Sequence, residues 1–187
     1  MTSKTLIQRI AQVDWNNLYW DSYKLSNNLG QYLWRTKLWW ITGITALLAV
    51  THFYGIGVNV TNSLPQYVFI LHKQVKPEQM KRNDYVTYRW HGAGPYPAGV
   101  QFTKIIKGMP GDRVEVRDRD FYVNGEFVGK AKPRALTGQP LEIGATGVIP
   151  PGHFYVYAPH PDSLDSRYAL TGWIRFEAVV GESKPLF

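Results

Sequence analysis

The hydrophobic residues of this chain form one long run near the N-terminus and many short runs after it. Residues 38–58 read LWWITGITALLAVTHFYGIGV and carry no acidic or basic side chain other than His52. A helix of about 20 mostly apolar residues is long enough to cross a bilayer. The run begins too late in the chain, and is too long, for a cleaved signal peptide. We therefore predict a transmembrane helix over residues 38–58.

The segment before this run, residues 1–37, places Leu6, Ile7, Ile10 and Val13 at helical spacing. This spacing is typical of an amphipathic helix in the headgroup region, and a partly ordered tail is the alternative. Only Lys73 follows the run closely, whereas five basic residues precede it: Lys4, Arg9, Lys24, Arg35 and Lys37. Because basic residues favour the cytoplasmic side, we predict a cytoplasmic N-terminus and an outward-facing domain.

The chain after residue 58 changes to short segments rich in β-branched and aromatic residues. The strand candidates are residues 67–71, 85–90, 102–107, 113–116, 153–157 and 173–180. Between two further short strands, Asn124-Gly125 is typical of a type I′ hairpin turn. Without a long helical pattern here, we predict that residues 59–187 form a mainly β domain, a coiled antiparallel sheet or small barrel.

The composition narrows the chemistry that this domain can perform. The chain has no cysteine, which excludes a thiol nucleophile, a disulfide and a thiolate metal site. Its net charge of +7 suits either anionic lipid or nucleic acid. The basic residues are scattered and do not alternate with aromatic residues, so we favour membrane lipid over nucleic acid as a partner.

Ser63 is the candidate nucleophile because it follows the apolar run by a few residues, at the surface of the predicted membrane. A serine in a polar turn is most often only a turn residue. Here Pro65 restricts the neighbouring backbone, and the hydroxyl of Thr61 is close enough to stabilise an oxyanion formed at Ser63. A serine nucleophile also needs a general base.

Lys104 is the candidate base, since none of the five histidines lies in a triad-like context. Strand alternation places Lys104 and Ile106 on one face, where an apolar environment lowers the pKa of an amine. An edge-strand lysine that discourages aggregation is the alternative interpretation. Lys107, on the opposite face beside a turn, is the competing base.

A third group of polar residues occurs in the segment 163–168, SLDSRY. Asp165 and Arg167, two positions apart, are expected to form an ion pair that fixes this loop. Ser163 or Ser166 is then placed to donate a hydrogen bond to Lys104 and to orient the neutral amine.

Taken together, these segments resemble the bacterial type I signal peptidases, a family of Ser/Lys proteases. The similarity rests on Ser-Leu-Pro at 63–65, KIIKGMPGD at 104–112 and SLDSR at 163–167, with Asn83-Asp84 where the family usually has Gly-Asp. It implies that Ser63 attacks the scissile carbonyl, that Lys104 takes its proton, and that Thr61 and the Ser63 backbone bind the oxyanion. It further implies that Ser163 contacts the lysine, that Asp165 and Arg167 form a structural salt bridge, and that no metal or organic cofactor is needed.

The departures from the family pattern point to one branch of it. Ser63-Leu64-Pro65 replaces the usual Ser-Met-x-Pro, residues 158–161 (APHP) replace Gly-Asn or Gly-Asp, and the segment between Lys104 and Asp165 is short. These features look most like TraF-type conjugative transfer peptidases, which mature a pilin and in some systems cyclise it. The resemblance implies a single-pass protein of the bacterial inner membrane with a periplasmic peptidase domain. Its substrate would be a precursor with an apolar segment and small residues before the cut. A housekeeping signal peptidase and a non-catalytic subunit of a conjugation apparatus are the alternatives.

Overall fold

The computed structural model describes residues 14–61 and 63–186, and the chain divides between Val50 and Thr51 into two compact units. Helix α2 (Trp15–Phe53) makes up the described part of the first unit and continues briefly into the second. Asp14 begins it, because its Oδ1 accepts a hydrogen bond of 3.2 Å from the backbone N–H of Asn17.

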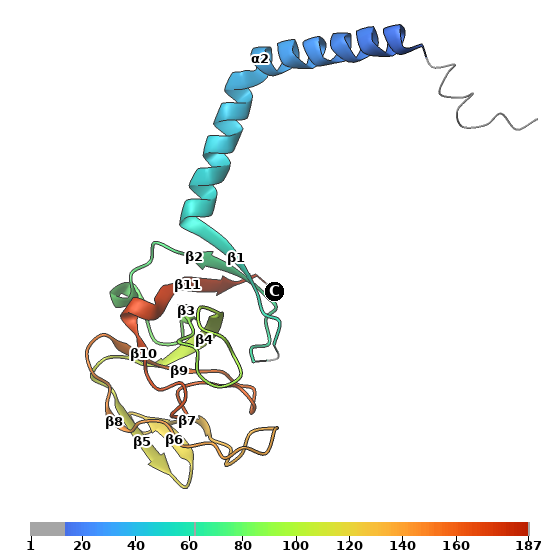
Figure 1. The fold of residues 1–187 in the computed structure, drawn as a ribbon. Helices are drawn as coiled ribbons and strands as arrows, with labels where there is room; N and C mark the ends of the chain where they lie inside the picture. Colours follow the sequence, from blue (N-terminus) through green and yellow to red (C-terminus); the bar gives the residue numbers. More distant parts are fainter. Residues whose placement is uncertain (1–13, 62, 187) are drawn as a thin grey trace, which may run out of the picture. The chain divides into compact units, whose positions relative to one another are not determined.

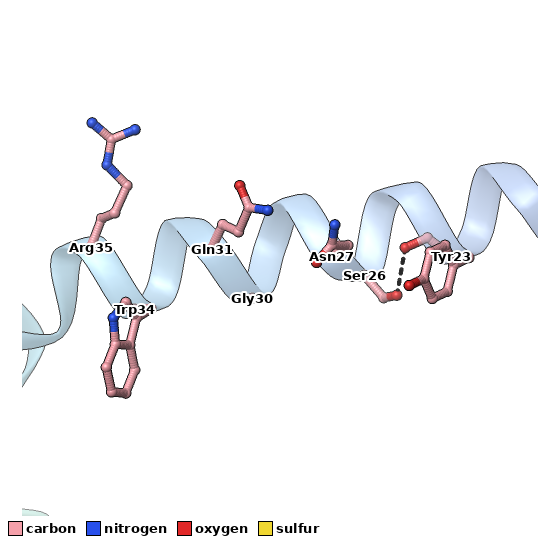
Figure 2. A pocket seen from close by; sticks show the side chains of 7 residues that line it. All are labelled: Tyr23, Ser26, Asn27, Gly30, Gln31, Trp34 and Arg35. Carbon is pink, nitrogen blue, oxygen red and sulfur yellow. Dashed lines mark hydrogen bonds between the residues drawn. The ribbon is translucent and has the colours of Figure 1, made fainter.

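Helix α2 runs without a break through residue 38, where the sequence analysis placed the boundary between the N-terminal segment 1–37 and the transmembrane helix 38–58. The first half carries a mixed polar and aromatic face: Tyr23, Ser26, Asn27, Gly30, Gln31, Trp34 and Arg35 (Figure 2). Ser26 Oγ donates to the Tyr23 carbonyl at 2.8 Å within this face. Leu6, Ile7, Ile10 and Val13 lie outside the described residues.

The prediction of a helix over residues 38–58 is wrong at its C-terminal end, because residues 54–58 form a strand. Strand β1 (Tyr54–Val58) pairs antiparallel with β2 (Val68–His72), from Tyr54 opposite His72 to Val58 opposite Val68. Two glycines and two β-branched residues in YGIGV disfavour a helix, and the backbone groups of β2 complete the ladder instead. Over residues 14–61 and 63–186, no helix is both long and apolar enough to span a membrane.

The second unit is mainly antiparallel β, as predicted, but it contains two sheets and not one coiled sheet (Figure 1). The seven-stranded sheet has the order β1-β2-β11-β3-β4-β9-β10, and the four-stranded sheet has the order β7-β6-β5-β8. Their remaining strands are β3 (Tyr85–Arg89), β4 (Gln101–Gly108), β5 (Arg113–Arg117), β6 (Asp120–Val123), β7 (Glu126–Lys130), β8 (Gly147–Val148), β9 (His153–Tyr157), β10 (Ile174–Arg175) and β11 (Val179–Pro185).

Strand β9 connects the two hydrophobic cores because its side chains alternate between them. Phe154 and Val156 belong to one core, and Tyr155 between them belongs to the other. The first core also holds Met80, Val86, Tyr88, Trp90, Ile106 and Ile174, and the second holds Val114, Phe121, Val123, Ala131, Ile149 and Tyr168. Because side chains alternate along a strand, the apolar residues of HFYVY contribute to the hydrophobic cores on both sides of β9.

One predicted strand is interrupted in the structure, and one predicted turn is present. The single strand expected over residues 173–180 is interrupted by the short 3₁₀ helix η2 (Phe176–Ala178), so that β10 lies at the edge of the large sheet beside β9, whereas β11 lies inside it, between β2 and β3. A second 3₁₀ helix, η1 (Pro77–Gln79), precedes β3. The predicted Asn124-Gly125 turn is present, with φ of 50° and 82°, as a type I′ turn requires.

Candidate active site

Ser63 lies in the loop of residues 59–67 between β1 and β2, where its neighbour Leu64 is buried. Leu64 packs with Phe69 and Ala158 in a small hydrophobic cluster. On the other side of the turn, the Asn59 side-chain amide donates to the carbonyls of Leu64 and Gln66, both at 3.1 Å. The position of the half-buried Ser63 is therefore fixed by the packing of Leu64 and by the two hydrogen bonds of Asn59.

Thr61 and Asn59 form a short hydrogen-bond chain with Ser63. Thr61 Oγ1 lies 3.0 Å from Ser63 Oγ and 3.0 Å from Asn59 Oδ1. Because an amide oxygen only accepts, Thr61 donates to Asn59 and is left to accept the proton of Ser63. Sequence reasoning missed Asn59; a polar side chain inside an otherwise apolar Val58–Val60 stretch was the available signal.

Lys104 is buried on β4, on the same strand face as Ile106, in agreement with the predicted alternation. Only 4% of its surface is exposed, which excludes a solvent-exposed lysine that discourages aggregation. Burial lowers its pKa from 10.5 to about 8; the Asp165 carboxylate partly opposes this change and the Arg167 guanidinium adds to it. The competing Lys107, on the other face, donates to Asn83 Oδ1 at 2.7 Å.

A groove of about 1290 Å³ brings the predicted site residues together. Thr61, Ser63, Lys104 and Ser163 all line it, although they come from three separate parts of the chain. Among the described residues no hydrogen bond joins Ser63 to Lys104, and Ser63 Oγ is paired with Thr61 instead. No cluster of three or more His, Asp or Glu side chains suited to a metal occurs in the described part of the chain.

The ion pair predicted between Asp165 and Arg167 is present and almost completely buried. Arg167 Nε lies 2.8 Å from Asp165 Oδ1, with side-chain exposures of 2% and 0%. Asp165 Oδ2 also accepts from the Ala158 backbone at 3.0 Å, and Arg167 donates to the Lys130 carbonyl at 2.8 Å. The pair therefore ties its loop to the ends of β7 and β9.

The hydrogen bond predicted from Ser163 or Ser166 to Lys104 is not formed in the described residues. Ser166 Oγ accepts from the Val156 backbone at 3.0 Å, so its role is to fix the loop on β9. Ser163 Oγ is buried and has no protein partner in the described part of the chain, although it lines the same groove as Lys104. A buried hydroxyl without a partner is costly, and a functional role is one reason for which such a group is retained.

Comparison with known proteins gives one family match and several relatives. The family model described as "Signal peptidase, peptidase S26" matches residues 31–187. The conjugal transfer protein TraF of Agrobacterium fabrum (strain C58) is 30% identical over 149 residues, which cover 71% of this chain and 82% of that protein. Signal peptidase I T of Bacillus subtilis (strain 168) is 30% identical over 99 residues, and the chain spans about half of its length (49%). A solved signal peptidase I from Enterococcus faecalis V583 is 25% identical and aligns with a TM-score of 0.37, over 55% of this chain and 95% of that one.

Proposed function

This chain belongs to the peptidase S26 family of signal peptidases, and we propose that it is a serine endopeptidase in which Ser63 and Lys104 form the catalytic dyad. The observation that carries the proposal is a buried lysine, with a pKa of about 8, lining the same groove as Ser63. A substantial fraction of this amine is neutral at mildly alkaline pH, which a general base requires.

The proposed reaction begins when the Ser63 hydroxyl turns from Thr61 to Lys104. The neutral amine takes the proton as Ser63 Oγ attacks the scissile carbonyl carbon, and the resulting ammonium returns a proton to the leaving amine. The Ser63 backbone N–H and the Thr61 hydroxyl, released from Asn59, stabilise the oxyanion. Water, activated by Lys104, then hydrolyses the acyl ester and restores Ser63.

The free edge of β4 supports a polypeptide substrate. Residues 101–104 pair with β3 only, because the pairing of β4 with β9 begins at Ile105. An extended peptide can add to such an edge as a further strand. The groove beside it is lined by apolar side chains, including Phe69, Leu71 and Phe102, which suits a precursor with small residues before the cut.

We further propose that the precursor is a conjugative pilin. The relative named as a conjugal transfer protein aligns over 82% of its length, whereas Signal peptidase I T aligns over 49%. If the acyl ester on Ser63 is attacked by the N-terminal amine of the same product instead of water, the product is a ring. A housekeeping signal peptidase remains the second candidate because two such enzymes are 30% and 31% identical to this chain.

The proposed place of action is the extracytoplasmic face of the bacterial inner membrane. Between Lys37 and Phe53 helix α2 contains no Asp, Glu, Lys or Arg. Its large apolar side chains in this part are exposed to solvent: Leu38, Trp39, Trp40, Ile41, Ile44, Leu47, Leu48, Val50 and Phe53. An apolar surface of this extent is expected to contact lipid. Flotation of the full chain with lipid vesicles, with loss of flotation for Leu47→Lys, tests this placement.

The catalytic proposal is tested with the full chain and a fluorogenic precursor peptide. Ser63→Ala and Lys104→Ala are each expected to lower kcat by several orders of magnitude, since the two groups act as a unit. Lys107→Ala, on the opposite face of β4, is the matched control and should cleave at the wild-type rate. Wild-type activity in either dyad variant would overturn the proposal, and an inactive wild-type chain would favour a non-catalytic subunit.

The choice of precursor is tested in cells that lack the endogenous copy of this protein. A candidate pilin and an ordinary secretory precursor are co-expressed with the wild type or with Ser63→Ala. We expect only the pilin to accumulate uncut with the variant. A mature pilin lighter than the linear product by one water establishes cyclisation, and accumulation of the secretory precursor assigns the housekeeping role.

A further inference from the structure

One wall of the groove is a basic flap that the catalytic proposal does not use. The flap comprises residues 131–141, and it contributes both Lys132 and Arg134 to the lining of the groove. It closes on itself through the Ala135–Gln139 turn and through a hydrogen bond of 2.9 Å from Leu141 to the Pro133 carbonyl. A flap closed in this way presents its side chains at a defined place in the groove.

The base of the flap is clamped by Arg119, which follows β5 in a left-handed conformation with φ of 68°. Its guanidinium donates to the carbonyls of Ala131, Lys132 and Leu141, at 2.9, 2.5 and 2.9 Å. These carbonyls belong to both legs of the flap. A single planar cation therefore fixes the two legs relative to the four-stranded sheet.

The charges on the flap are only partly balanced within the described residues. Lys132 forms an ion pair with Asp162, the one acidic side chain among the described residues that line the groove. Arg134 donates to the Gly138 carbonyl at 2.9 Å and has no carboxylate partner in the described part of the chain. Its side chain is exposed and lines the groove, so that the flap carries one uncompensated positive charge there.

We propose that Arg134 is a specificity residue that selects an acidic side chain in the substrate polypeptide. This inference rests on the proposed peptidase function, because the groove that holds Ser63 and Lys104 also holds Arg134. A planar guanidinium pairs with a carboxylate through two parallel hydrogen bonds, and it does so better than with any neutral side chain. Arg134 thus recognises an acidic side chain of the bound substrate at a position other than the cleaved bond.

The test uses the full chain and a series of peptides that carry Glu, Gln or Lys at each position around the cleaved bond. At one position we expect kcat/KM to favour Glu over Lys by up to about fivefold, the ratio typical of an exposed charge pair, and to lose this preference at high salt. Arg134→Gln should bring the ratio to one, and Arg134→Glu should invert it. Arg113→Gln removes an exposed arginine that does not line the groove, and is the matched control.

Binding measured separately distinguishes the two proposals. In the Ser63→Ala background, fluorescence anisotropy reports peptide affinity without cleavage, and the Glu peptide should bind more tightly than the Lys peptide only when Arg134 is present. Equal affinities for both peptides, with cleavage of both by the wild type, overturn the role of Arg134 and leave the peptidase intact. A loss of binding to anionic vesicles in Arg134→Glu, with unchanged peptide selectivity, would assign Arg134 to the lipid surface instead.

Discussion

Asp165 and Arg167 form a buried ion pair two positions apart, with 2.8 Å between Oδ1 and Nε. Each partner also holds backbone groups outside the pair: Asp165 accepts from Ala158, and Arg167 donates to Lys130. The loop that carries Ser163 into the groove is therefore fixed by charge and by backbone hydrogen bonds at the same place.

Asp165→Ala is expected to lower the free energy of unfolding by about 3–5 kcal/mol, because it leaves the Arg167 guanidinium buried without its counter-charge. Peptidase activity should fall with it, as the loop shifts. Glu115→Ala is the matched control: Glu115 and Arg117 are also two positions apart, but on the surface, and the expected loss is at most about 1 kcal/mol. Urea titrations measure both. If Asp165→Ala kept wild-type stability and lost activity, Asp165 would have a chemical role instead.

Gly144→Ala is expected to disturb the loop that carries Asp165 and Arg167, because Gly144 packs against its backbone. A Cβ at this position would lie 2.2 Å from the Ser166 carbonyl oxygen, and the Gly144 N–H donates to the Arg167 carbonyl at 2.8 Å. Either the backbone of the loop moves or this hydrogen bond is lost, so we expect a loss of about 1–3 kcal/mol together with reduced kcat. Gly57→Ala serves as the stability control, since its Cβ would meet only Phe69 Cβ, at 3.9 Å. Equal melting temperatures for the two variants would contradict the expectation.

The strands and the ion pair were predictable because each depends on a short stretch of sequence. Alternation placed Lys104 on the face of Ile106, and Asn124-Gly125 specified its turn. The end of helix α2 was not predictable from hydrophobicity, because the YGIGV segment is as apolar as the helix before it. Only the pairing of β1 with β2, which requires the later residues 68–72, shows that this segment is a strand.

The hydrogen-bond partners of the Ser163 and Ser166 hydroxyl groups could not be predicted from the sequence either. Ser163 and Ser166 occupy equivalent positions beside an Asp, yet one accepts from Val156 and the other has no partner among the described residues. Which serine faces β9 depends on how the loop crosses that strand. Asn59 was missed for a similar reason, since its amide bridges two carbonyls that become neighbours only once the turn has formed.

Thr61→Val is expected to lower kcat by about 10²–10³ with little change in KM, because it removes a donor that the proposed mechanism uses only in the transition state. Thr61→Ser keeps the hydroxyl and should retain most of the activity. Thr61 is exposed, so the unfolding free energy of either variant should stay within about 0.5 kcal/mol of wild type. Steady-state kinetics on the precursor peptide measure the effect, and a kcat for Thr61→Val equal to that of the wild type would remove Thr61 from the oxyanion site.

The lowered pKa of Lys104 predicts that both activity and stability rise with pH. The amine has a pKa of about 8 in the folded chain and an ordinary value of 10.5 when unfolded. Below pH 8 both states bind the proton, and the folded state bears the full cost of burying the charge. Between pH 8 and 10.5 the unfolded state binds more protons, so stability increases by on the order of 3 kcal/mol across this interval. Activity should increase through about pH 8 as the neutral amine forms.

Lys104→Met separates this effect from other titrations, because it removes the amine and keeps an apolar side chain of similar length. The variant should be inactive, more stable than wild type at pH 7, and no more stable above pH 10.5, since the buried charge is then absent from both proteins. Lys107→Met, on the opposite face of β4, should leave the pH dependence of stability unchanged. Urea denaturation at a series of pH values measures these differences. A constant stability difference between Lys104→Met and wild type from pH 7 to 10.5 would show that the folded chain does not depress this pKa.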